Sequence, residues 1–283
     1  MITRRSFIPL AAAAVSPLAY SKSDPQLQRG RLKQSVTQGV FKGRQMTLDD
    51  MCRESAEMGI YGFDLIDPKD WPTLKKYGLV PTMGPPPYGG TIPDALNRKE
   101  NHDRIRVTMT KIIDQAAGAG VPNVITFSGN RRGMSDEEGA DNCVLFLNSI
   151  KSYAEDKNVT ICMELLNSKV NHKDYMCDHA AWGAGVMKRV NSPRVKLLYD
   201  IYHMQIMDGD IVRTVRDNIQ YIGHFHTGGN PGRHEIDGTQ ELNYRFVAQS
   251  IADLGYTGVV AHEYTPVREP IESLKQAIQI FTV

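Results

Sequence analysis

Four short apolar segments decide the fold of this 283-residue chain: TICME (160–164), VKLLYD (195–200), IGHFH (222–226) and VVAHE (259–263). Each has the length and the composition of a buried strand, and each ends in a carboxylate or an imidazole side chain. These last residues are 36, 26 and 37 positions apart (164 to 200, 200 to 226, 226 to 263), which is about one strand-plus-helix unit. The spacing therefore predicts strands that alternate with helices.

The same alternation runs through the rest of the chain and predicts an α/β protein of the single (β/α)8 barrel type. An open, doubly wound sheet would usually carry a glycine-rich phosphate turn after its first strand, and residues 37–43 do not match that pattern. The predicted strands are 32–36, 62–66, 80–83, 123–127, 160–165, 195–199, 221–226 and 258–262, and the predicted helices are 47–58, 71–77, 101–119, 135–156, 179–190, 210–218, 243–254 and 270–281.

The first 24 residues differ in character from the rest. RRSFI (4–8) precedes a short alanine-rich apolar run and then small residues, which is typical of a signal peptide and resembles the twin-arginine export signal. The apolar run is too short for a permanent membrane anchor. We therefore expect an export signal over residues 1–24, a barrel domain over residues 25–283, and a periplasmic location.

Composition limits the class of partner. The formal net charge is +1, which gives no basic excess for binding nucleic acid or an anionic membrane, so we expect a small-molecule partner.

The four cysteines are far apart and form no C-x-x-C pair, and we expect buried thiols. The sequence leaves a homo-oligomer open.

The strand ends also predict a metal site. Carboxyl ends of neighbouring barrel strands converge at one mouth, so Glu164, Asp200, His226 and Glu263 should meet there. Each alone has another explanation, because a carboxylate can cap a helix and a histidine can be a hydrogen-bonded core residue. Acidic groups gathered at one mouth would repel one another without a cation between them. Their oxygen-rich donor set suits Mn²⁺, Mg²⁺ or Co²⁺, and Zn²⁺ is also compatible.

Four motifs carry a resemblance to a known family: MELLN (163–167), DIYH (200–203), PGRHE (231–235) and HEY (262–264). In this order they resemble the xylose isomerase-like barrel superfamily, and within it the hydroxypyruvate isomerase branch. The resemblance covers nearly the whole chain after residue 24. It implies a metal-dependent isomerase of a small sugar or hydroxy-keto acid, which converts a hydroxypyruvate-like compound to one like tartronate semialdehyde through an enediolate.

The resemblance also implies roles for individual residues. Glu164 and Glu263 would bind the metal and exchange a proton with the substrate carbons, while Asp200 and His226 would complete the metal shell. Return of the proton to the neighbouring carbon gives isomerisation, and return to the opposite face of the same carbon gives epimerisation. Because both outcomes need the same groups, the ligand set does not choose between them.

Two further residues are similar to those that hold substrate oxygens in the family, His203 and Arg233. His203 is expected on the loop beside the metal, where a purely supporting role is the alternative. Arg233 offers a planar fork for a carboxylate or paired hydroxyls, against a loop salt bridge with Glu235 or Asp237. The residues expected to support this site are Asn167, His234 and Glu235.

Departures from the family pattern leave other activities open. His226 stands where some hydroxypyruvate isomerases carry glutamine, as in ketose 3-epimerases, whereas Val170 stands where those epimerases tend to place a glutamate. A keto-inositol dehydratase would use the same site. Remoter alternatives are an apurinic-site endonuclease, which would need more histidine ligands and a basic surface, and a non-catalytic sugar-binding barrel.

Two more histidines lie on the strands that carry the predicted ligands. His224 and His262 are expected to face away from the barrel axis and to serve in packing or in support of the site.

Overall fold

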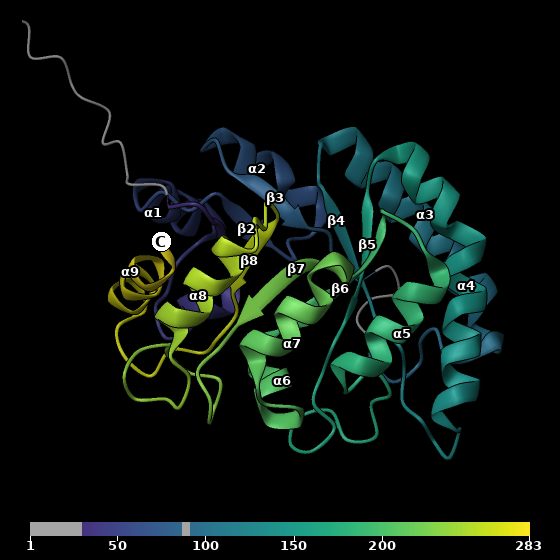
Figure 1. The fold of residues 1–283 in the computed structure, drawn as a ribbon. Helices are drawn as coiled ribbons and strands as arrows, with labels where there is room; N and C mark the ends of the chain where they lie inside the picture. Colours follow the sequence, from purple (N-terminus) through teal and green to yellow (C-terminus); the bar gives the residue numbers. More distant parts are fainter. Residues whose placement is uncertain (1–29, 87–90) are drawn as a thin grey trace, which may run out of the picture.

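The computed structural model describes residues 30–86 and 91–283. In this part of the chain eight parallel strands form one sheet in the order β3-β2-β1-β8-β7-β6-β5-β4 (Figure 1). The strands are β1 (Lys33–Val36), β2 (Gly62–Asp64), β3 (Val80–Met83), β4 (Asn123–Thr126), β5 (Thr160–Glu164), β6 (Val195–Asp200), β7 (Ile222–Thr227) and β8 (Val259–His262).

The sheet closes at the seam between β3 and β4. Gly84, the residue after β3, forms a parallel bridge with Val124. The Gly84 N–H donates to the Asn123 carbonyl at 2.8 Å, and the Gly84 carbonyl accepts from the Ile125 N–H at 3.3 Å. A closed barrel leaves no exposed strand edge, so the predicted single (β/α)8 barrel is confirmed.

Helices cover the outside of this sheet, with α3, α4 and α5 on one side of the barrel and α8 and α9 on another (Figure 1). Their apolar faces and the outer faces of the strands form one continuous hydrophobic core. The helices are α1 (Leu48–Glu57), α2 (Trp71–Lys76), α3 (His102–Ala119), α4 (Asp136–Lys157), α5 (Ala180–Val190), α6 (Ile201–Met207), α7 (Ile211–Asn218), α8 (Tyr244–Asp253) and α9 (Pro270–Phe281), and the short 3-10 turns are η1 (Gln38–Phe41), η2 (Pro68–Asp70), η3 (Lys99–Asn101) and η4 (Ile219–Tyr221).

Local capping explains where several helices begin and end. Thr47 and Asp50 form a capping box at the start of α1, and Ser135 accepts the Glu138 N–H at the start of α4. Such caps stabilise a helix by about 1 kcal/mol each. At the end of α3, Gly120 adopts a left-handed φ of 74°, which a glycine reaches without strain. The chain then turns directly into the next strand.

Helix α6 is absent from the sequence-based prediction, which placed a loop after residue 199. Asp200 instead ends β6 and caps α6, because its carboxylate accepts the His203 N–H at 3.2 Å. The helix has only seven residues, too few for a clear apolar period. His203 therefore lies in the first turn of a helix and not on a loop.

The remaining predictions about the chain have different outcomes. All four cysteines are free and buried, as expected. The predicted export signal, residues 1–24, lies outside the described residues. Among the helices of residues 30–86 and 91–283, none is both long enough and apolar enough to cross a bilayer.

Candidate metal centre

The four predicted ligands meet at the carboxyl ends of their strands. Glu164 ends β5, Asp200 ends β6, His226 is the penultimate residue of β7, and Glu263 follows β8. One donor atom from each side chain lies within 4.8 Å of the donor atoms of the other three. We call this group the metal centre.

His226 contacts both glutamates of the metal centre. Its ring is fully buried, with Nδ1 at 2.6 Å from Glu263 Oε2 and 3.4 Å from Glu164 Oε1. Neither contact has hydrogen-bond geometry, so the buried Nδ1 atom has no hydrogen-bond partner. A buried ring nitrogen that faces two carboxylates without a hydrogen bond is the arrangement expected around a cation.

Arg233 joins the other carboxylates of the metal centre. Its Nη2 atom lies 2.7 Å from Asp200 Oδ2 and 2.7 Å from Glu263 Oε2. The guanidinium lies over the Tyr202 ring at 5.4 Å. The alternative partners of Arg233 in the loop, Glu235 and Asp237, pair with Arg268 instead.

His203 and Asn167 form a buried pair beside Asp200. His203 Nδ1 accepts the backbone N–H of Asn167 at 3.2 Å and lies 2.6 Å from the Asn167 side-chain amide nitrogen. With Nδ1 acting as an acceptor, the ring proton is on Nε2. This Nε2 atom has no hydrogen-bond partner and lies 3.6 Å from Asp200 Oδ2. His203 therefore presents a spare donor next to the metal centre.

His234 and Glu235 hold the loop that carries Arg233. His234 Nδ1 lies 2.9 Å from the Thr265 carbonyl oxygen. The buried Glu235 carboxylate accepts the backbone N–H groups of Val267 and Arg268, both at 3.0 Å. These contacts connect the loop after β7 to the segment after β8.

The sequence analysis missed Asp64, a fully buried carboxylate on β2. Its Oδ2 atom lies 3.0 Å from His226 Nε2 and 2.6 Å from His224 Nε2. Strands β2 and β7 are not neighbours in the sheet, so these side chains meet inside the barrel. The available signal was a charged residue within the otherwise apolar run 62–66.

The two other strand histidines have opposite orientations. His224 contacts Asp64 inside the barrel, so the expectation that it faces away from the axis is wrong. Side chains two positions apart share a face of a strand, and His224 is two residues before His226. His262 does face outward, where it lies 3.0 Å from both Thr227 Oγ1 and Gln34 Oε1 and packs on the Phe281 ring of α9.

Comparison with known proteins agrees with this geometry. The model of the family described as xylose isomerase-like TIM barrel matches residues 71–282. The chain belongs to this family.

Curated relatives of this xylose isomerase-like barrel match part of it. The chain is 33% identical over 112 residues to the "Putative hydroxypyruvate isomerase" of Homo sapiens (40% of each chain). It is 34% identical over 113 residues to the "2-oxo-tetronate isomerase" of Cupriavidus necator (40% of this chain, 43% of the relative). It is 31% identical over 117 residues to the "D-psicose 3-epimerase" of Agrobacterium fabrum (41% and 39%). Each match spans less than half of the relative.

A solved structure extends the likeness to most of the chain. The AP endonuclease, family 2, from Brucella melitensis superposes with a TM-score of 0.76, covers 86% of this chain and 97% of its own, and is 23% identical. At this identity the likeness concerns the fold.

The two glutamates of this xylose isomerase-like barrel differ in their electrostatic environment. Burial raises the pKa of Glu164 to about 7. Burial opposes ionisation of Glu263 too, but the nearby charges of Arg233 and His226 lower its pKa to about 2. Environments that separate the pKa values of two neighbouring carboxyl groups are typical of acid and base pairs.

The donor set of the metal centre fits a divalent cation. Three carboxylates and one imidazole are a hard, mostly oxygen ligand set, and their donor atoms are already gathered. The positive guanidinium of Arg233 contacts two of these carboxylates, Asp200 and Glu263. Glu263 is the most accessible of these four side chains, with a quarter of its area exposed.

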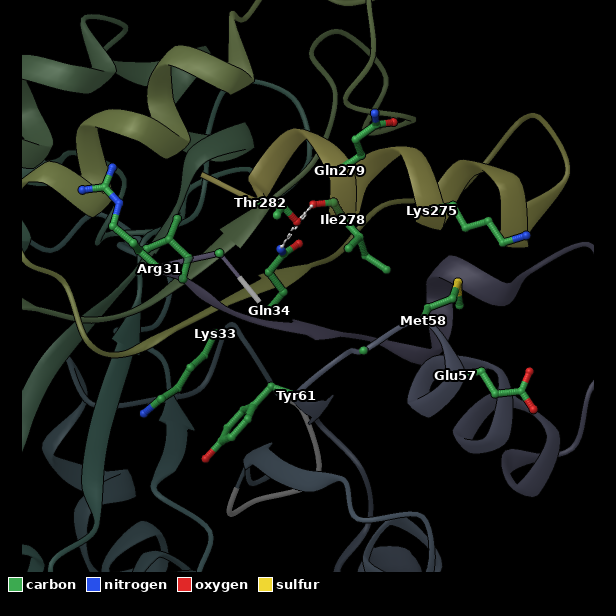
Figure 2. A pocket seen from close by; sticks show the side chains of 13 residues that line it. Arg31, Lys33, Gln34, Glu57, Met58, Tyr61, Lys275, Ile278, Gln279 and Thr282 are labelled. Atoms are coloured by element: carbon green, nitrogen blue, oxygen red, sulfur yellow. Dashed lines mark hydrogen bonds between the residues drawn. The ribbon is translucent and has the colours of Figure 1, made fainter. Parts of the chain in front are cut away.

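Two cavities lie at opposite ends of the barrel. A polar cavity of about 300 Å³ at the carboxyl ends is lined by Arg233 and by Glu263 of the metal centre. A larger, more apolar cavity of about 680 Å³ lies where β1 begins and α9 ends, and Figure 2 shows Gln34 bonded there to Ile278 and Thr282. None of the four ligands lines the larger cavity.

Proposed function

We propose that this chain is a metal-dependent isomerase of a small hydroxycarbonyl compound, with hydroxypyruvate as the type substrate. The observation that carries the proposal is the metal centre, in which Glu164 and Glu263 both face Nδ1 of His226 and Glu263 lines the cavity at the carboxyl ends of the strands. The partial relatives named hydroxypyruvate isomerase and 2-oxo-tetronate isomerase support this class of reaction.

Glu164, Asp200, His226 and Glu263 would hold the cation, for which Mn²⁺, Mg²⁺ and Co²⁺ suit the oxygen-rich donors and Zn²⁺ is also compatible. When bound, it would stabilise the negative charge that develops on the substrate oxygens and so acidify the adjacent C–H.

Glu164 and Glu263 carry the proton in this proposal. The lowered pKa of Glu263 keeps it ionised near neutral pH, ready to accept a proton from the substrate carbon. Because the pKa of Glu164 is raised to about 7, this group can give its own proton to the neighbouring carbon, while the proton of the substrate hydroxyl passes to the former carbonyl oxygen. Glu263 then releases to solvent the proton it took and Glu164 takes one up, which restores both groups.

His203 and Arg233 orient the substrate. The unpaired Nε2–H of His203 can donate to a substrate oxygen, and its ring stays neutral because burial and the Arg233 charge lower its pKa. Arg233 lines the cavity and offers its fork to a substrate carboxylate. The backbone N–H of Asn167 donates to Nδ1 of His203 and so fixes the orientation of its ring.

The direct test is proton exchange in D₂O. Protein loaded with Mn²⁺ is incubated with hydroxypyruvate, ketohexoses or keto-inositols, and products and deuterium are followed by NMR. We expect deuterium on the carbon next to the carbonyl of hydroxypyruvate, with formation of the aldehyde isomer. No exchange with any compound would contradict the proposal.

Variants of the two glutamates sharpen this test. We expect Glu164→Gln and Glu263→Gln to lose turnover by about 10³-fold or more while the fold is kept. Glu155→Gln on α4 is the matched control, since the exposed Glu155 carboxylate accepts the Ser192 hydroxyl at 2.6 Å and lies outside the metal centre. If the wild type binds the sugar without turnover and both glutamate variants bind it with the same affinity, the protein would instead be a sugar-binding barrel.

A ketose 3-epimerase is the second candidate. The observation that favours it is the imidazole of His226 in the metal centre, together with the partial relative named D-psicose 3-epimerase. The same D₂O experiment separates the two, because epimerisation places deuterium on C3 of a ketohexose and yields its epimer.

We also propose that the protein is exported to the periplasm. The support is the RRSFI motif and the apolar run that follows it. Replacement of Arg4 and Arg5 by lysine should retain the protein in the cytoplasm, as measured by fractionation. A wild-type protein found in the cytoplasm would contradict this location.

A further inference from the structure

Asp64 lies directly beneath the metal centre, inside the barrel. Its Oδ1 atom is held by two hydroxyl groups, Ser35 Oγ at 2.8 Å and the Thr82 hydroxyl. Its Oδ2 atom faces His224 and His226. Among the described residues, the ion-pair contacts of Asp64 are with these two rings, so the buried carboxylate is anchored on one side and aims at imidazoles on the other.

The two nitrogens of His226 face opposite ways. Nε2 lies 3.0 Å from Asp64 Oδ2, with hydrogen-bond geometry, whereas Nδ1 faces Glu164 and Glu263. An imidazole binds a metal through a nitrogen that carries no proton, and the hydrogen bond of the other nitrogen sets which one that is. When Nε2–H donates to Asp64, the Nδ1 lone pair points into the metal centre.

His224 supports the same arrangement from one layer below. It is fully buried, its ring meets the His226 ring edge-on at 5.4 Å between centroids, and its Nε2 atom approaches the same Asp64 oxygen. Its Nδ1 atom lies 3.5 Å from the Asn123 amide nitrogen. These contacts restrict both the Asp64 carboxylate and the His226 ring to one orientation.

We propose that Asp64 is a positioning residue that orients His226 for cation binding. The inference rests on the proposed metal centre and adds a residue from the first half of the barrel, which supplies none of the ligands. Replacement by asparagine would offer an N–H₂ group to His226 Nε2 and move the ring proton to Nδ1, where it blocks coordination. We expect Asp64→Asn to weaken Mn²⁺ binding by about 10- to 100-fold.

A double-mutant cycle measured by isothermal titration calorimetry tests this coupling. In His226→Asn, the shorter amide keeps an oxygen near the Nδ1 position and has no atom that reaches Asp64. Asp64→Asn should therefore weaken Mn²⁺ binding strongly in the wild-type background and by less than about twofold in the His226→Asn background. In the Zn²⁺-loaded wild-type protein, ¹⁵N-histidine NMR should show Nε2 of His226 protonated and Nδ1 unprotonated.

Matched variants separate positioning from folding. Asp178→Asn removes another buried carboxylate, paired with Arg131, and should leave Mn²⁺ affinity unchanged. Should Asp64→Asn fail to fold, Thr82→Val loosens Asp64 without removing it and should weaken binding by about two- to tenfold.

The outcomes distinguish the two proposals. Suppose that the wild type binds Mn²⁺ and that Asp64→Asn lowers the affinity equally in both backgrounds, or in neither. This result would overturn the role of Asp64 and leave the metal centre intact. A wild-type protein that binds no divalent cation would overturn the metal centre and this inference together.

Discussion

The Nη2 atom of Arg233 lies 2.7 Å from Oε2 of Glu263, the glutamate proposed to accept the substrate proton. The same atom lies 2.7 Å from Asp200 Oδ2, so one guanidinium offsets two of the three carboxylates in the metal centre. Arg233 therefore has two roles to be tested: it balances charge in the cluster and it meets substrate in the cavity.

Arg233→Ala should destabilise the metal-free protein, because Asp200 and Glu263 lose their positive partner. We expect a decrease of about 2–4 kcal/mol in the free energy of unfolding, measured with urea. Mn²⁺ should restore most of it, since a bound cation supplies the missing charge. Arg268→Ala, which removes a half-exposed loop arginine paired with Asp237, is the control and should cost less than about 1 kcal/mol. Equal urea curves for both variants would rule out this charge role.

The stability of the metal-free protein should depend on pH through Glu164. Burial raises the folded-state pKa of this carboxyl from 4.5 to about 7, so its contribution is complete below pH 4.5 and is lost as pH rises through 7. We expect the melting temperature of the wild type minus that of Glu164→Gln to fall between pH 5 and pH 8 in EDTA. A difference independent of pH would argue against the raised pKa.

The loop that carries Arg233 needs a glycine at position 229. A Cβ there would lie 2.0 Å from the Glu235 carbonyl oxygen, too close for any side chain. Gly229→Ala should therefore cost about 1–3 kcal/mol and lower kcat/KM by moving Arg233. Gly238→Ala in the same loop meets no atom within 4 Å and should leave both quantities unchanged. Equal kcat/KM of the two variants would show that activity does not depend on the conformation of this loop.

His203→Asn should weaken substrate binding selectively. The amide oxygen can replace Nδ1 as the acceptor for the Asn167 N–H, whereas the free Nε2 donor is lost. A missing hydrogen bond of about 1–3 kcal/mol corresponds to a decrease of roughly 5- to 150-fold in kcat/KM. His179→Asn at an exposed position is the control. Unchanged kcat/KM with a lower melting temperature would leave His203 a supporting role only.

Much of the architecture followed from patterns along the chain. The observed bounds of β3 and α9 equal the predicted ones, because a short apolar run and an amphipathic period mark them locally. The four ligands could be proposed as a group because parallel strands bring their carboxyl ends to one mouth. Helix α6 was missed since seven residues carry too weak a period.

Local patterns were thus enough to predict the eight strands, most of the helices, the closed barrel and the meeting of four side chains at its mouth, because these depend on periodicities of two and 3.6 residues that neighbouring positions display. Only the folded barrel decided that Asp64 meets His226, 162 positions away, and that Arg233 lies between Asp200 and Glu263. Such contacts join strands and loops that are not neighbours, so they depend on strand tilt, stagger and loop path, which no local propensity encodes.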